Sequence, residues 1–133
     1  MAVEAVNKLI KREHRVIGIG SGSTIVFAVE RLKERMVEEG LDFVCIPSSY
    51  QAKSLIIGQG LPLGDLDIYS EIDITIDGAD EIVLDRNCLI KGGGGALLRE
   101  KIIAACAKRF VVIADYRKLS DSVGKMVLLL NEL

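Results

Sequence analysis

Short apolar runs alternate along this chain with segments of helical periodicity. The runs at residues 16–20, 43–46 and 110–114 carry almost no polar side chains, which is typical of strands buried on both faces of a parallel sheet. Between Ser23 and Gly40, apolar residues recur at the spacing of one helical face. This alternation predicts an α/β fold, in which an open, mainly parallel sheet carries helices on both faces in a Rossmann-like three-layer arrangement.

Further elements follow from the same reasoning. Residues 1–12 and 96–108 have the apolar content and spacing of helices. Residues 50–57 lie between a Pro-Ser-Ser turn and two glycines, which predicts a short helix. Residues 72–76 alternate between apolar and polar side chains, so we expect a strand that runs into an acidic turn at residues 77–80.

Composition excludes several classes of function. The 133 residues suit a single domain, and a hydrophobic content of 50% leaves apolar surface for a partner subunit. The 17 basic and 19 acidic residues are scattered and give a net charge of −2, so we expect no nucleic-acid partner. No apolar run approaches the roughly 20 residues of a membrane span, and the N-terminus lacks a signal pattern. We therefore expect no membrane partner and a cytoplasmic location.

The potential metal ligands are sparse. The three cysteines, Cys45, Cys88 and Cys106, form no CxxC pair, and His14 is the single histidine. Zinc sites need more ligands at closer spacing, so the sequence predicts no metal site of this kind. An odd number of cysteines is most simply explained by buried, reduced thiols.

The first predicted strand ends in the loop at residues 20–24, Gly-Ser-Gly-Ser-Thr, directly before a helix. Ligands of open parallel sheets bind outside the carboxyl ends of strands, and a helix start presents N–H groups to an anion. The loop therefore favours a phosphate or a polyhydroxy ligand, although a Gly-Ser turn with a Ser or Thr cap also forms without one. The nucleotide patterns do not fit, because Ser23 replaces the third glycine of the Rossmann pattern and Lys91 precedes the glycines that a Walker lysine follows.

Two carboxylates, Asp77 and Asp80, lie three residues apart in a turn that contains glycine. Crowding two negative charges is unfavourable unless a counter-charge or a function compensates for it. Such a pair binds sugar hydroxyls or moves protons, and magnesium is a further ligand for it. The ordinary alternative is a solvated acidic turn in which Glu81 begins a helix.

Four successive glycines, at residues 92–95, follow Lys91. Glycines in such a run mark a place where side chains would obstruct a ligand or another backbone, with a flexible loop as the alternative. Glu100 lies in the first turns of the helix behind this loop. From its position alone, Glu100 is an ordinary surface glutamate.

Taken together, residues 20–24, 77–81 and 91–101 resemble the signatures of the ribose-5-phosphate isomerase A family. Residues 46–51 and 113–118 are also similar to segments of that family. The resemblance implies an isomerase that interconverts D-ribose 5-phosphate and D-ribulose 5-phosphate in the non-oxidative pentose phosphate pathway. It also implies that the reaction uses neither a metal nor an organic cofactor.

The resemblance implies a role for each motif. Glu100 takes the position of the base that moves a proton between C2 and C1 through an enediolate. Lys91 stabilises the oxyanion, Asp77 assists ring opening or proton transfer, and Asp80 orients hydroxyls. The substrate-contacting positions are Ser21, Gly22, Ser23, Thr24, Asp77, Gly78, Ala79, Asp80, Lys91, Gly92, Gly93, Gly94 and Lys118. The phosphate is held by the loop at residues 20–24 or by Lys118, and the sequence does not decide between them.

The resemblance also sets expectations for organisation. We expect residues 1–133 to form a single α/β catalytic domain that is truncated relative to the family, with the second, smaller family domain absent. A homo-oligomer, either a dimer or a tetramer, is implied as well. A sugar-phosphate-binding module or an inactive fragment of the family stays open as an alternative function. Acyl or coenzyme A transfer by a glutamate nucleophile is a weaker alternative, because the isomerase signature is so extensive.

Overall fold

The computed structural model describes residues 2–78, 81–83, 88–90, 103, 106–114 and 126–130. Its elements in chain order are α1 (Ala2–Leu9), β1 (Val16–Ile19), α2 (Ile25–Glu39), β2 (Val44–Pro47), α3 (Tyr50–Gly58), β3 (Ile74–Gly78), β4 (Glu81–Val83), β5 (Cys88–Ile90), β6 (Phe110–Ala114) and β7 (Met126–Leu130). None of the described helices is both long and apolar enough to cross a membrane.

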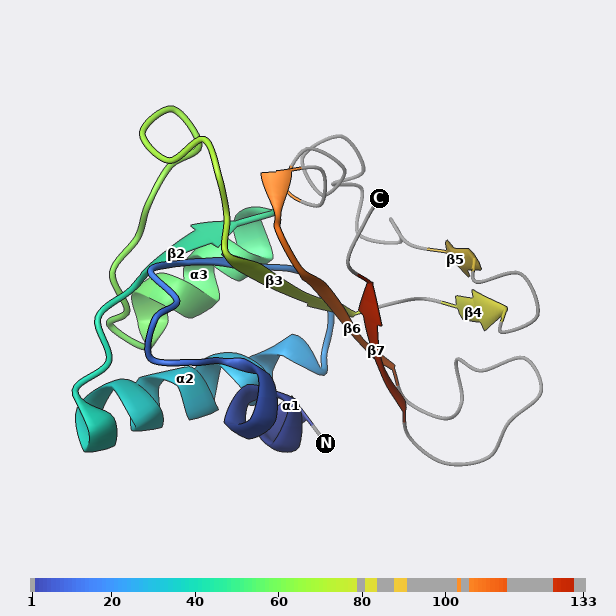
Figure 1. The fold of residues 1–133 in the computed structure, drawn as a ribbon, viewed down its shortest axis with the longest axis horizontal. Coiled ribbons are helices and arrows are strands. Elements are labelled where there is room, and N and C mark those ends of the chain that lie inside the picture. Colours follow the sequence, from blue (N-terminus) through green and yellow to red (C-terminus); the bar gives the residue numbers. More distant parts are fainter. Residues whose placement is uncertain are drawn as a thin grey trace.

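Five strands form one sheet in the order β2-β1-β3-β6-β7 (Figure 1). The first four run parallel to one another, and β7 runs antiparallel to β6. The predicted open, mainly parallel sheet is therefore confirmed. A separate antiparallel pair, β4 and β5, was not predicted, because strands of three residues are too short to show a period. The alternative in which Glu81 begins a helix is wrong, since Glu81 begins β4.

The sheet has a core on each face. On one face, α1, α2 and α3 pack on strand residues that include Ile17, Ile74 and Val111. On the opposite face, Ile46 and Ile72 pack with Ile103. Within the helix predicted at residues 96–108, Ile103 and Cys106 are helical. Helices on both faces are therefore also confirmed. The predicted end at residue 108 is wrong, because Ala107 forms a parallel bridge with Ile72 and Lys108 lies in a bend.

The element boundaries differ from the predictions where a neighbouring strand or helix decides them. The third strand extends beyond residues 72–76, because Asp77 and Gly78 pair with Val112 and Ile113 of β6. Asp77 thus lies in the strand and not in a turn. At the other end, Gly40 stops α2 with a left-handed φ of 65°, as the sequence predicts.

Cys45 lies on β2 and has no exposed surface. Burial raises the pKa of its thiol to about 12, so the thiol stays protonated at neutral pH. Cys45 and Cys106 are both free. The prediction of a buried, reduced thiol is confirmed for Cys45, whereas Cys106 is only partly buried and the Cys88 side chain lies outside the described part of the structure.

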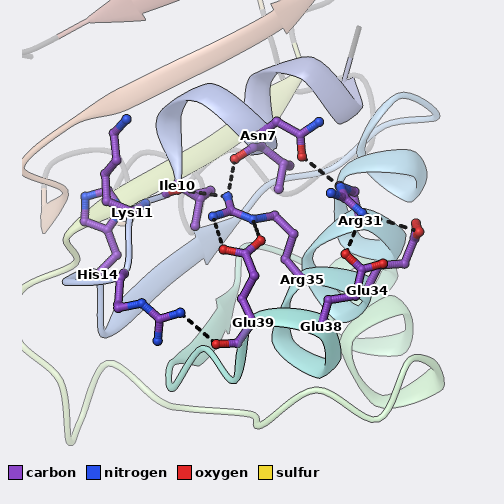
Figure 2. Close-up of polar contacts among 11 residues, drawn as sticks. Asn7, Ile10, Lys11, His14, Arg31, Glu34, Arg35, Glu38 and Glu39 are labelled. Atoms are coloured by element: carbon purple, nitrogen blue, oxygen red, sulfur yellow. Dashed lines mark hydrogen bonds and ion pairs between the residues drawn. The ribbon is translucent and has the colours of Figure 1, made fainter.

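Arg35 joins α1 to α2 (Figure 2). Its Nη1 donates to the carbonyl oxygens of Val6 at 2.7 Å and Ile10 at 2.8 Å, at the carboxyl end of α1. The Val6 carbonyl also accepts the N–H of Ile10 at 3.2 Å. Its Nε and Nη2 donate to the two carboxylate oxygens of Glu39, at 2.6 and 3.1 Å. The hydrogen bond to Glu39 raises the pKa of Arg35. The fork of the guanidinium thus fills four acceptor positions. The helix α1 ends at Leu9, before the predicted residue 12.

Arg35→Lys is expected to lower the free energy of unfolding by about 2 kcal/mol, because an ammonium cannot reproduce the fork of hydrogen bonds. Urea denaturation measures this difference. Arg31→Lys on the same helix is the matched control, since Arg31 forms partly exposed ion pairs with Glu34 and Glu38 and reaches α1 through a side chain, Asn7, instead of through backbone carbonyls. An equal loss in the two variants would show that the bonds from Arg35 to the backbone carbonyls contribute nothing specific.

Asp73 ties the start of β1 to the segment before β3. Burial alone would raise the pKa of this carboxyl, but the N–H groups of Arg15, at 2.7 Å, and Val16, at 3.0 Å, donate to its Oδ2. With the charge of Lys108, these bonds bring the pKa of Asp73 below its usual value. The folded state therefore favours the ionised carboxylate.

Because the folded pKa of Asp73 is the lower one, its contribution to stability is complete above the unfolded pKa of about 4 and is lost as the pH falls through the folded pKa. Asp73→Asn is expected to be less stable than the wild type at pH 7, by a margin that shrinks towards pH 3. Urea denaturation across this range measures the margin, with Asp42→Asn, an exposed residue, as control. A margin independent of pH would contradict the assignment.

Candidate active site

The site lies at the carboxyl ends of three neighbouring strands. Because β2, β1 and β3 are parallel and adjacent, the loop at residues 20–24, the segment at residues 48–51 and the end of β3 meet at one edge of the sheet. The sequence predicts two of these three segments as ligand-binding. Their contacts show how the backbone of the loop is held.

Asp77 connects β3 to the loop. The residue is only 1% exposed, and its Oδ1 accepts hydrogen bonds from the N–H of Ser21 at 3.1 Å and of Gly78 at 2.8 Å. A buried carboxylate is stable only when hydrogen bonds or charges compensate for lost solvation. The two N–H groups supply part of this compensation and fix the direction of the carboxylate.

Gly20 is required because its backbone lies directly against Asp77. A Cβ at position 20 would lie 1.9 Å from Oδ1 of Asp77 and 2.7 Å from its Cα. The N–H of Gly20 also donates to the carbonyl of Ile76 at 2.8 Å. No residue with a side chain fits here without displacing β3.

The segment after β2 holds the loop from the other side. The Ser21 hydroxyl donates to Ser49 Oγ at 2.9 Å and lies 3.4 Å from Ser48 Oγ. The carboxamide of Gln51 binds both polar backbone groups of Gly22. The sequence-based list of site residues omits Ser48, Ser49 and Gln51, although residues 46–51 resemble a family segment and follow a strand.

The N–H groups of the loop are not equivalent. Those of Gly20, Ser21 and Gly22 donate to protein acceptors, namely a strand carbonyl, Asp77 and Gln51. Within the described part of the chain, the N–H groups of Ser23 and Thr24 have no acceptor. Thr24 Oγ1 is buried without a partner there and does not cap α2. The donors left for an anion are therefore concentrated at Ser23 and Thr24, directly before α2.

A family model described as ribose 5-phosphate isomerase A (phosphoriboisomerase A) matches residues 44–130. The chain belongs to this family. The resemblance stated from the sequence is thereby confirmed.

Several ribose-5-phosphate isomerases are similar to this chain. The human protein is 59% identical over 85% of the chain, and that of Candida albicans is 50% identical over 93%. A solved structure of ribose 5-phosphate isomerase A from Methanocaldococcus jannaschii is 46% identical, with a TM-score of 0.82, and the match covers 89% of this chain and 51% of that one. A structure of D-ribose-5-phosphate isomerase in complex with phospho-erythronic acid is 41% identical, with a TM-score of 0.83, over 92% of this chain and 53% of that one.

The chain spans about half or less of the length of these relatives: 36% of the human protein and 50% of the Candida albicans protein. The sequence identity to these relatives supports the assignment of the chain to the ribose 5-phosphate isomerase A family.

The structure brings part of the predicted site together. The residues that it places at the strand ends are Ser21, Gly22, Ser23, Thr24, Asp77 and Gly78. The predicted residues that lie outside the described part of the structure are Ala79, Asp80, Lys91, Gly92, Gly93, Gly94, Glu100 and Lys118. Among the described residues, no group of three or more His, Cys, Asp or Glu side chains is arranged to hold a metal ion.

Proposed function

We propose that this chain carries the catalytic site of an aldose–ketose isomerase that interconverts D-ribose 5-phosphate and D-ribulose 5-phosphate. The observation that carries the proposal is the junction of Asp77 with the loop at residues 20–24, in a chain of the ribose 5-phosphate isomerase A family. A phosphorylated ligand is supported by the relative solved with phospho-erythronic acid. The chemistry follows from the residues of this chain.

The phosphate is assigned to the start of α2. The N–H groups of Ser23 and Thr24 have no acceptor among the described residues, and α2 has 15 residues whose aligned peptide dipoles favour an anion at its N-terminus. The buried hydroxyl of Thr24 supplies a further donor. This assignment favours the loop over Lys118 as the main phosphate contact.

The proton transfer is assigned to residues that the family resemblance supplies. Glu100 takes the proton from C2 of the open-chain aldose and returns one to C1 through an enediolate, so that the carbonyl moves from C1 to C2. Lys91 stabilises the negative oxygen of this intermediate, and Asp80 orients hydroxyls. Asp77 assists ring opening or proton transfer between the oxygens, from a direction that Ser21 and Gly78 fix.

We further propose that residues 1–133 act as one α/β catalytic domain within a cytoplasmic homo-oligomer, a dimer or a tetramer. Large apolar side chains on the surface support an oligomer: Phe27 is 57% exposed, Val37 70% and Tyr50 86%. Sedimentation equilibrium distinguishes a dimer or tetramer from a monomer.

The reaction is tested by incubating the folded chain with ribose 5-phosphate in deuterated water and following the product by NMR. The expected product is ribulose 5-phosphate that carries solvent deuterium at C1, the carbon that receives the proton. Glu100→Gln is expected to lower turnover at least about 10³-fold, because an amide cannot accept the proton. Glu30→Gln, on the exposed side of α2, is the matched control.

A folded wild type that neither turns over nor exchanges hydrogen contradicts the isomerase proposal. If such a sample still binds ribose 5-phosphate, the chain is a sugar-phosphate-binding module or an inactive fragment instead. Full turnover by Glu100→Gln would reject the assigned base and leave the reaction standing.

A further inference from the structure

We infer that Gln51 is a positioning residue for phosphate binding, which aims the N–H of Ser23 at the phosphate through its two hydrogen bonds to Gly22. The inference rests on the proposed function and extends it to a residue that is not among the predicted site residues. Gln51 makes no assigned contact with substrate and acts only through the backbone of the loop.

The carboxamide of Gln51 matches Gly22 at both polar atoms. Its Oε1 accepts from the N–H of Gly22 at 3.1 Å, and its Nε2 donates to the carbonyl of Gly22 at 3.4 Å. The same carbonyl also accepts the N–H of Ile25, the first residue of α2, at 3.3 Å. Both polar backbone groups of Gly22, the N–H and the carbonyl, are thus hydrogen-bonded.

Gly22 needs such support because of its backbone conformation. Its φ of 115° lies in the region that residues with side chains rarely adopt, and a glycine there has many other conformations available. Among the described residues, a Cβ at position 22 would meet nothing within 4 Å, so their packing does not hold this residue. Hydrogen bonds from Gln51 and Ile25 are what selects one conformation.

Fixing the carbonyl of Gly22 also fixes the N–H of Ser23. The two groups belong to one trans peptide, in which the C=O and the N–H point in opposite directions. With the carbonyl directed at Gln51 and Ile25, the N–H of Ser23 is directed away from both. Gln51 at the same time occupies the N–H of Gly22, so the phosphate donors begin at Ser23.

The position of Gln51 itself is set by the start of α3. Ser49 caps this helix by accepting the N–H of Ala52 at 3.2 Å, and the same oxygen accepts the Ser21 hydroxyl. The first turn of α3 is therefore tied to the loop at two points, through Ser49 and through Gln51. A neutral amide also adds no negative charge beside the anion.

The test uses Gln51→Ala and Gln51→Met, with Gln59→Ala at the other end of α3 as control. Methionine keeps the length and the apolar contacts of glutamine but loses both hydrogen bonds, so it separates positioning from packing. Both variants are expected to raise KM for ribose 5-phosphate and the dissociation constant for inorganic phosphate about five- to tenfold, the loss of about one hydrogen bond. We expect kcat to stay within about twofold, because the reacting carbons are not involved.

Gln51→Glu provides a second comparison. It keeps an oxygen for the N–H of Gly22 but places a negative charge near the phosphate, so its KM is expected to rise further than that of Gln51→Met. The effect of charge should weaken at high salt. The ¹⁵N-HSQC amide signals of Gly22 and Ser23 report the loop directly and are expected to shift in every Gln51 variant but not in Gln59→Ala.

Unchanged phosphate affinity and KM in Gln51→Met would overturn the inference, as would a fall in kcat at constant KM. If Gln51→Ala fails to fold, Gln51→Met and the amide signals decide. Phosphate binding is measured by calorimetry without turnover, so a chain that binds phosphate but does not isomerise refutes the proposed reaction and still tests Gln51. A wild type that binds no phosphate overturns the role of Gln51 itself.

Discussion

Gly20→Ala is expected to lower the free energy of unfolding by about 3 kcal/mol and to remove phosphate binding, although it adds a single methyl group. The new Cβ would lie 1.9 Å from Oδ1 and 2.7 Å from Cα of Asp77. Rotating the carboxylate relieves the first contact but not the second, which involves the backbone of β3. The strands β1 and β3 must therefore separate, and the bond from Ser21 to Asp77 is lost with them.

Urea denaturation and calorimetry with inorganic phosphate measure the two effects of Gly20→Ala. Gly58→Ala is the matched control, because a Cβ at position 58 meets nothing within 4 Å and Gly58 lies at the end of α3. We expect this control to stay within about 0.5 kcal/mol of the wild type. Stability and phosphate affinity at the wild-type level in Gly20→Ala would show that the strands tolerate the close approach.

The alternation of short apolar runs with segments of helical periodicity was sufficient to predict the main strands and helices. Residues 110–114 were predicted with the bounds that β6 has, because a short run without polar residues is typical of a strand buried on both faces. Periodicity does not show which strands lie side by side. The strand order β2-β1-β3 is what places Asp77 against Gly20, so the reason for that glycine was not available from the sequence.

The residues that the sequence analysis missed have partners distant in the chain. Gln51 is two residues beyond a predicted turn, and nothing local shows that its amide meets Gly22, which is 29 positions earlier. Arg35 looks like one of several charged residues on α2, but it is buried because the carbonyls of α1 lie above it. Side chains of this kind become predictable only once the packing of the elements is known.

Asp77 is expected to combine two roles that different substitutions separate. Asp77→Ala removes the acceptor that the N–H groups of Ser21 and Gly78 share. Leaving buried donors without an acceptor is expected to lower the free energy of unfolding by about 2–3 kcal/mol. Asp77→Asn keeps one oxygen in the same place, so its stability should stay within about 1 kcal/mol of the wild type.

Asp77→Asn should lose turnover even though it keeps its stability. Under the proposed isomerase chemistry, Asp77→Asn cannot take or return a proton during ring opening or transfer between oxygens, and we expect turnover to fall by about 10²–10³-fold. The NMR assay in deuterated water measures it, with the exposed Asp67→Asn as control. Phosphate affinity is expected to survive in Asp77→Asn, because the Ser21 bond that anchors the loop survives.

The two Asp77 variants together decide what the buried carboxylate does. If Asp77→Asn folds, binds phosphate and turns over at the wild-type rate, the charge has no chemical role and the oxygen serves only as an anchor for Ser21. If both variants lose stability equally, the amide oxygen has not replaced the carboxylate oxygen, and the loss of turnover carries no chemical information. The expected pattern, in which Asp77→Asn is stable and slow while Asp77→Ala is unstable, requires a site in which one oxygen positions the loop and the charge serves the reaction.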